Sequence, residues 1–200
     1  MASDGNVSRD RPMMRITLND KDEKILIDIK NVLKYSGNIT NSIKSNSSTL
    51  AFTSKSIYEK LNKIGITPRK TYCLDIEKII SNIPKEFFGD FIRGYFDGDG
   101  SIGYIADVKT GTISRYKVTI TASKDTCLIL NELLGFNSKY YERTFNVEEC
   151  VGFGSIQITS IEKLEIFYNL IYPPGVSLFL ERKKKKFDEL LINKNKKITI

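Results

Sequence analysis

Histidine is absent from this chain of 200 residues. Its absence excludes Ser-His-Asp and Cys-His catalysis, metal sites with imidazole ligands, and nucleases of the HNH type, because each of these requires an imidazole. If the chain is an enzyme, its chemistry must therefore come from carboxylates, lysines and metal ions.

Cysteine is scarce, with three residues at Cys73, Cys127 and Cys150. Their odd number and wide spacing match neither a disulfide framework nor paired zinc ligands. We interpret them as reduced thiols that fill small positions in the core.

Long apolar runs are also missing. No stretch has the length needed to span a bilayer, and the N-terminal residues lack the apolar segment of a signal peptide. The sequence therefore predicts an intracellular protein that is not secreted and does not bind a membrane. Its location would be the cytoplasm or nucleoid, an organelle, or a phage-encoded context.

Basic residues exceed acidic ones, 31 to 24, which gives a net charge of +7. Such a balance favours a polyanionic partner, because each phosphate that a protein neutralises releases condensed counterions. Charge alone is a weak indicator, since many basic proteins bind no nucleic acid.

The chain contains two similar halves. Residues 13–37 resemble residues 115–135, and residues 48–54 resemble residues 154–160. In this alignment Thr17 corresponds to Thr119 and Thr53-Ser54 to Thr159-Ser160, at offsets of 102 and 106 positions. A duplication of this size predicts two similar domains, residues 1–80 and 81–200, packed side by side.

Two segments alternate apolar and polar residues with the period of a half-buried strand. The apolar set is Met14, Ile16, Leu18, Tyr116, Val118 and Ile120, and the polar set is Arg15, Thr17, Asn19, Arg115, Lys117 and Thr119. Helices are expected at 22–33, 55–64, 125–134 and 161–171, with Gly37 ending the first. The pattern predicts an α+β repeat, in which helices cover one face of a twisted antiparallel sheet and leave a basic face open.

Duplex DNA is the partner that the open faces favour. Any half-exposed sheet alternates polar and apolar residues, but here Arg, Lys, Tyr, Asn, Ser and Thr recur on four hairpins. A two-stranded ribbon fits the major groove, where Arg and Lys reach guanine and Asn reaches adenine. The predicted DNA-binding residues are Arg9, Arg15, Thr17, Asn41, Lys44, Asn46, Tyr104, Arg115, Lys117, Lys139, Arg143 and Gln157.

The most specific segment is residues 83–104, IPKEFFGDFIRGYFDGDGSIGY. Pro84 suits the first turn of a helix, which ends in Asp97 and Asp99 directly before a strand. The C-terminal end of the helix dipole disfavours negative charge, so a bound cation would stabilise this pair of acids. A calcium loop is excluded because Ile102 and Val108 replace its essential glycine and glutamate. A plain acidic turn remains the simpler alternative.

Residues 92–100, IRGYFDGDG, resemble the LAGLIDADG motif, with Gly94, Asp97, Asp99 and Gly100 in their expected places. The similarity extends over nearly the whole chain, which resembles the two-repeat LAGLIDADG homing endonucleases. It implies an α+β fold of tandem αββαββα half-repeats and double-strand cleavage of DNA with Mg²⁺ or Mn²⁺. It also implies that the Asp99 carboxylate and the Gly98 carbonyl bind the metal.

In the first half, residues 2–7, ASDGNV, resemble the end of the same motif. The resemblance makes Asp4 the second catalytic and metal-binding acid and Ser3 the small residue before it. The motif helix of the family does not precede this position in the sequence. We therefore expect a second chain, or a homodimer, to supply a partner helix.

The family also places one lysine in each active site, and the matching positions are Lys70 and Lys183. A lysine there could polarise the attacking water or stabilise charge on phosphorus. For Lys183 the alternative is a charge run, residues 182–186, that contacts only phosphate or solvent. Lys70, beside Arg69, has the same alternative.

Two other functions stay open. One is a catalytically inactive nucleic-acid-binding protein of the same fold, such as an RNA maturase or a transcriptional regulator. The other is an endonuclease fragment of an intein, although the chain contains no splicing domain and its last residues, KNKKITI, lack the His-Asn pair of a splicing junction.

Overall fold

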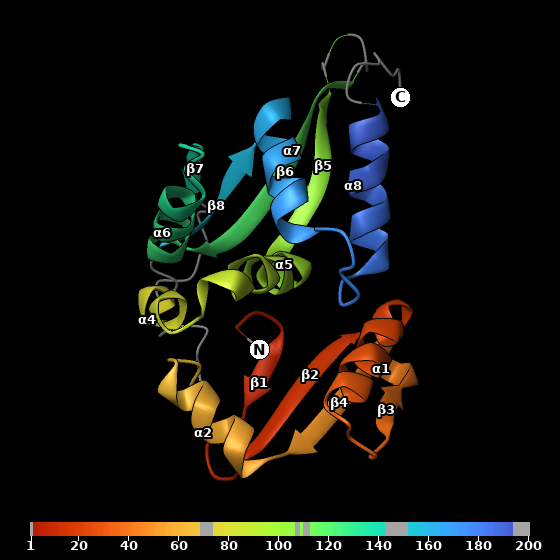
Figure 1. Cartoon of the computed structure of the whole chain (residues 1–200). Coiled ribbons are helices and arrows are strands. Elements are labelled where there is room, and N and C mark those ends of the chain that lie inside the picture. The colour runs from red at the N-terminus through yellow and green to blue at the C-terminus, as the bar shows by residue number, and fades with distance from the viewer. Residues whose placement is uncertain (1, 69–73, 107–108, 110–112, 143–151, 194–200) are drawn as a thin grey trace. The chain divides into compact units, whose positions relative to one another are not determined.

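A computed structural model describes residues 2–68, 74–106, 109, 113–142 and 152–193 of the chain. Contacts divide it into unit 1, Met1–Phe88 with Ser177–Leu180, and unit 2, Gly89–Val176 with Glu181–Ile200. The main division falls after Phe88, and the predicted boundary lies between residues 80 and 81. Each unit is described by itself, with the element labels of Figure 1.

Each unit contains one four-stranded antiparallel sheet, and the strand order is the same in both. In unit 1 the order is β1 (Gly5–Val7), β2 (Met13–Asn19), β4 (Ser47–Thr53) and β3 (Ile39–Ser42). In unit 2 it is β5 (Gly100–Ala106), β6 (Ile113–Ser123), β8 (Phe153–Ile158) and β7 (Tyr140–Glu142). The predicted α+β class with two antiparallel sheets is confirmed.

Helices connect the strands in a repeated order (Figure 1). Unit 1 contains the 3-10 helices η1 (Asp20–Asp22) and η2 (Ile43–Ser45), together with α1 (Glu23–Val32), α2 (Lys55–Lys63) and α4 (Ile76–Ser81). The 3-10 turn η3 (Lys85–Phe87) leads into α5 (Phe88–Asp99), which is followed in unit 2 by α6 (Lys124–Leu134), α7 (Ile161–Ile171) and α8 (Glu181–Asn193). Side chains cap several of these helices. Ser54 Oγ accepts from Ile57 N at 3.3 Å, and Asp75 Oδ1 accepts from Lys78 N at 2.9 Å.

Helix α1 ends at Val32, one residue before the predicted end at Leu33, but Gly37 does not terminate it. The predicted stop residue is Gly37, but Lys34 takes the left-handed conformation, with φ of 51°. Tyr35 N donates to Lys30 O and Lys34 N to Asn31 O, both at 3.0 Å, which closes the helix end. The prediction for Gly37 is wrong because a lysine adopts the position that glycine usually takes.

The core of each unit lies between the sheet and its helices. On β2, Met14 is fully buried while Arg15 and Thr17 are exposed, so the predicted alternation is confirmed. In unit 2, the side chains of Val118, Ile120, Phe96, Phe167 and Phe187 are at most 1% exposed. Such alternation places the apolar side of the sheet against helices.

One predicted core thiol lies among the described residues. Cys127 on α6 is fully buried, and burial raises the pKa of its thiol to about 11, so it stays protonated at neutral pH. This agrees with its interpretation as a small core residue. Cys73 and Cys150 lie outside the described residues.

None of the helices in the described part of the chain combines the length and the apolar character that crossing a bilayer requires.

Phe167 of α7 joins three other rings in the core of unit 2. Its centroid lies 5.4 Å from that of Phe96, 6.3 Å from Phe136 and 6.4 Å from Phe187. Phe167→Ala should lower the free energy of unfolding by about 3 to 5 kcal/mol, because it leaves a cavity between these rings. Denaturation followed by circular dichroism measures this. Ile166→Ala, at a neighbouring side chain that is 52% exposed, should change it by less than about 0.5 kcal/mol. Equal losses in the two variants would contradict the packing.

Candidate active site and nucleic-acid interface

The acids of the motif lie in the last turn of α5. Asp97, Gly98 and Asp99, which we call the acid turn, belong to the helix, and Gly100 is the first residue of β5. The change from helix to strand therefore occurs within one residue. A Cβ atom at Gly100 would lie 2.5 Å from the Phe96 carbonyl oxygen. Glycine is required here because the main chain passes so close to the helix end.

Lys183 of α8 reaches the acid turn from a neighbouring helix. Its Nζ donates to the carbonyl oxygens of Phe96 at 2.7 Å, Asp97 at 2.6 Å and Gly100 at 2.6 Å. The same nitrogen lies 5.2 Å from the centroid of the Phe96 ring. These contacts join α8 to the junction between α5 and β5, and Figure 1 shows α8 running beside β5.

Lys183 is only 6% exposed, so the interpretation of this residue as part of a solvated charge run is wrong. Its neighbours Arg182, Lys185 and Lys186 are exposed and do fit that description. Helical spacing distinguishes Lys183 from these neighbours, because Lys183 lies on the buried side of α8 with Phe187 and Leu190.

The ammonium group of Lys183 also changes the electrostatics of the helix end. Two acids beside the negative end of a helix dipole are stabilised by a nearby cation, which the sequence predicts to be a bound ion. Lys183 places such a cation there within the chain itself.

Each acid is close to a different buried tyrosine. Burial, and to a smaller extent the Asp97 carboxylate, raises the pKa of Tyr172. Burial, and to a smaller extent the Asp99 carboxylate, raises the pKa of Tyr95. Both phenols are therefore neutral at physiological pH and can act only as neutral groups near the acid turn.

The first acid, Asp4, occupies the position in unit 1 that Asp99 occupies in unit 2. Each precedes the first residue of an edge strand, and these residues, Gly5 and Gly100, pair with Ile16 and Ile120. In the same way Ser3 corresponds to Gly98. The register of the two sheets therefore supports the matching of the acids, which the sequence analysis took from the family resemblance.

The same register corrects one correspondence between the halves. Because Ile16 is equivalent to Ile120, Thr17 corresponds to Thr121, and the predicted match of Thr17 with Thr119 is wrong by two residues. Phe52 pairs with Met14 as Ile158 pairs with Val118, which agrees with the match of Thr53-Ser54 to Thr159-Ser160. A shift of two keeps each side chain on its face, so alternation cannot detect it.

The open face of the unit 1 sheet, the side away from Met14 and Leu50, carries Arg15 and Thr17. Across the strands Arg15 pairs with Ala51 and Thr17 with Thr49, and the two threonine hydroxyls bond each other at 2.9 Å. Thr49 is not among the predicted DNA-binding residues, although it alternates with the buried Leu50. The result is a polar face with few charges.

Asn41, predicted to bind DNA, lies on the opposite face. It pairs with the buried Ser48, and its Nδ2 donates to Glu23 Oε2 of α1 at 2.9 Å. Ser48 Oγ donates to the same carboxylate oxygen at 2.7 Å. Asn41 therefore attaches β3 to the covering helix, and the interpretation of it as a member of the open face is wrong.

The other candidates of unit 1 are exposed residues of turns. Arg9 lies between β1 and β2. Lys44 lies in the turn between β3 and β4, which Asn46 closes with φ of 45°. Lys70 lies outside the described residues.

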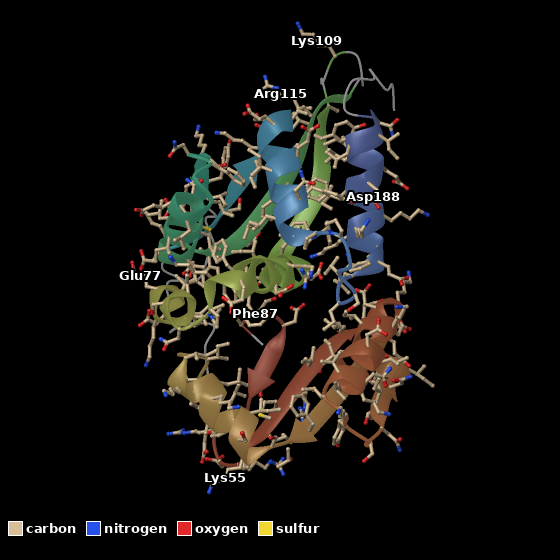
Figure 2. The ribbon with its side chains drawn as sticks, viewed as in Figure 1. Lys55, Glu77, Phe87, Lys109, Arg115 and Asp188 are labelled. Atoms are coloured by element: carbon tan, nitrogen blue, oxygen red, sulfur yellow. The ribbon has the colours of Figure 1, made fainter. Side chains whose placement is uncertain are left out.

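The open face of unit 2 is more basic. Lys117 pairs with Gly103, Arg115 with Ile105, and Gln157 with Thr119, so the three predicted residues share this face. Arg115 lies toward the end of the sheet farthest from α5 (Figure 2). A Cβ atom at Gly103 would lie 3.6 Å from Lys117 Cε, so the lysine stem lies over a strand position without a side chain.

Two further DNA-binding candidates of unit 2 are Tyr104 and Lys139. Tyr104 pairs with Tyr116 on the helix side of the sheet, so its assignment to the open face is wrong. Lys139 lies over the ring of Tyr141, with Nζ 5.3 Å from the centroid. Tyr141, which the sequence analysis did not select, pairs with Ser155 on the open face. Arg143 lies outside the described residues.

No protein-family model and no curated protein matches the chain by sequence. Solved structures match it by fold. The I-LtrWI LAGLIDADG homing endonuclease bound to target DNA is 15% identical with a TM-score of 0.58, over 96% of this chain and 87% of that one. I-GzeII in complex with its DNA target is 14% identical with a TM-score of 0.58, over 96% and 87%. Meganuclease I-SmaMI bound to uncleaveable DNA is 15% identical with a TM-score of 0.63, over 98% and 89%. The chain therefore has the LAGLIDADG homing endonuclease fold.

Gly100→Ala should lower the free energy of unfolding by about 1 to 3 kcal/mol, because the new methyl group would press on the Phe96 carbonyl group. The matched control is Gly103→Ala on the same strand, where the flexible end of Lys117 can move aside and the change should stay below about 0.5 kcal/mol. Chemical denaturation of both variants measures the difference. Equal stability of the two would show that the junction has more space than the structure indicates.

Proposed function

We propose that this chain, which has the fold of the LAGLIDADG homing endonucleases, is a site-specific DNA endonuclease. Its two open sheet faces bind duplex DNA, and its acid turn supports hydrolysis of phosphodiester bonds with a divalent metal. The observation that carries this proposal is the acid turn, which presents Asp99 at the junction of a helix and an edge strand, with Asp4 at the equivalent position of the other unit.

DNA binding is supported by the side chains of the open faces. On unit 2 the donors are the charged groups of Arg115 and Lys117 and the amide of Gln157. On unit 1 the donor is the guanidinium group of Arg15, which lies among threonine hydroxyl and methyl groups. Cationic side chains contact phosphates or guanine, and threonine methyl groups can contact thymine. The net charge of +7 favours this partner over neutral ones.

The donors of the acid turn fit Mg²⁺ or Mn²⁺. The Asp99 carboxylate and the neighbouring Gly98 carbonyl are hard oxygen ligands, and Mg²⁺ typically takes one or two carboxylates and completes its shell with water and substrate phosphate. Among the described residues, no three Cys, Asp or Glu side chains form a metal cluster. The site would therefore be completed by the DNA and solvent.

In this mechanism the chain positions the DNA and the donors. The open faces hold the duplex, while Asp99 and Gly98 in one unit, and Asp4 and Ser3 in the other, would each serve one strand. When bound, a divalent ion supplies Lewis acidity that activates water and stabilises the leaving 3′ oxygen. Tyr95 stays neutral beside Asp99 because burial raises its pKa, so it adds no second negative charge to the site.

DNA affinity should fall steeply with salt concentration. Replacing Arg115 and Lys117 together by Ala should lower the slope of log affinity against log salt by about two, one for each lost phosphate contact. The charge-matched control replaces Lys55 and Lys60, exposed residues of α2. Fluorescence anisotropy with a labelled duplex measures both slopes. If the control lowers the slope as much as the Arg115 and Lys117 variant, the open face is not the binding surface.

Asp99→Asn should abolish cleavage and leave DNA binding intact, because the amide keeps the shape of the carboxylate without its charge. A duplex selected from a randomised library in EDTA serves as substrate, with Mg²⁺ or Mn²⁺ added for cleavage. Asp125→Asn, at an exposed acid of α6, should cleave normally. Cleavage by Asp99→Asn would overturn the site. Binding without cleavage by the unmodified chain would favour an inactive nucleic-acid-binding protein of the same fold.

We also propose that α5 pairs with a second helix, from another copy of the chain or from a separate segment. Gly94 on α5 is exposed, and a Cβ atom there would contact no atom of unit 2 within 4 Å. Small residues allow close approach of two helices. Sedimentation velocity at micromolar concentration should therefore show a dimer that Gly94→Leu weakens. A monomer with full cleavage activity would contradict this pairing.

A further inference from the structure

We propose that Lys183 is a positioning residue, which holds the main chain of the acid turn, and that it does not act on DNA or water. The proposal rests on the proposed metal-binding role of Asp99 and Gly98. It assigns Lys183 a different task from the water-polarising or charge-stabilising one that the family resemblance implies.

The hydrogen bonds of Lys183 carry this inference. An ammonium group has three N–H donors, and the structure gives it three carbonyl acceptors at 2.6 to 2.7 Å. Donation to a phosphate or a water molecule would require one of these charge-assisted bonds to break. The three carbonyl acceptors therefore occupy the N–H groups of Lys183, which leaves the ammonium little capacity to donate to a substrate.

The surroundings of Lys183 point the same way. The residue is 6% exposed, and on α8 it shares the buried side with Phe187 and Leu190. Its Nζ also lies 5.2 Å from the centre of the Phe96 ring. A buried side chain held by packing along its stem has little freedom to move toward a bound ligand.

The positions of the three acceptors explain what Lys183 holds. Phe96 and Asp97 precede Gly98 and Asp99, and Gly100 follows them, so the two proposed metal donors lie between fixed points. Carbonyl groups of a last helical turn lack intrahelical partners and are otherwise free to tilt. By fixing them, Lys183 determines the direction of the Gly98 carbonyl and of the Asp99 side chain.

The ammonium also opposes the negative helix end and the two carboxylates. We therefore infer that the acid turn keeps its shape without a divalent metal.

Lys184, the next residue, offers a matched control. Its Nζ bonds Tyr168 Oη at 3.1 Å and Asp188 Oδ2 at 2.9 Å, so it joins α8 to α7 and does not contact the acid turn. Lys184→Met removes the same charge from the same helix as Lys183→Met. Only Lys183→Met removes the bonds to the acid turn.

The first experiment needs no substrate. Hydrogen exchange in EDTA should show protected amides at residues 96–103 in the unmodified chain and in Lys184→Met, with loss of protection there in Lys183→Met. Mn²⁺ should leave the protection of the unmodified chain unchanged. If these amides exchange freely in EDTA in the unmodified chain, the inference is overturned even if Lys183→Met fails to fold.

The second experiment titrates Mn²⁺ into the complex of each variant with the selected duplex. Lys183→Met should bind Mn²⁺ about 10- to 100-fold more weakly, as expected when the support of a metal ligand is lost, and should recover cleavage at high Mn²⁺ concentration. A catalytic lysine would instead leave Mn²⁺ affinity unchanged and abolish cleavage at every concentration, which would overturn the inference. Failure of the unmodified chain to bind Mn²⁺ would refute the proposed function, and hydrogen exchange would still decide the role of Lys183.

Discussion

The bonds between the Lys183 ammonium and three main-chain carbonyls are the contact on which the geometry of the candidate site depends. They join α8, α5 and β5 at the residue where helix becomes strand. Without a buried cation, unpaired carbonyl groups, the negative end of a helix and two carboxylates would lie close together at this junction and would repel one another. A lysine that is distant in sequence therefore permits the close approach of Phe96 and Gly100 and the placement of Asp99 beside it.

The duplicated sheet gives this junction a counterpart. Both sheets have the same strand order, and in both the edge strand begins opposite an equivalent isoleucine, Ile16 or Ile120. The register therefore places Asp4 and Asp99 at equivalent positions, each directly before an edge strand. The residues around the two acids differ. Lys183 and its carbonyl acceptors belong to unit 2, and the unit 1 acid follows a serine where Asp99 follows a glycine.

The two open faces have different chemistry. In unit 1 the hydroxyls of Thr17 and Thr49 bond each other, so their methyl groups and Ala51 contribute much of the surface beside Arg15. In unit 2, Arg115, Lys117 and Gln157 carry long polar side chains. Under the proposed function, faces of such different character suit an asymmetric DNA site more than a palindromic one, because each half of the duplex would meet different donors.

Much of the fold could be predicted from the sequence because periodic burial leaves a local signal. Alternation identified β2 and β6, helical spacing identified α1, α2, α6 and α7, and the motif identified Asp97 and Asp99. The sequence could not decide what depends on neighbours across the fold. Alternation is unchanged by a shift of two residues, so it matched Thr17 to Thr119. It also does not show which polar residue bonds a covering helix, as Asn41 does. The run of cations that contains Lys183 predicts that the lysine is exposed to solvent. Only the packing of α8 against α5 brings the Lys183 ammonium to three carbonyl groups.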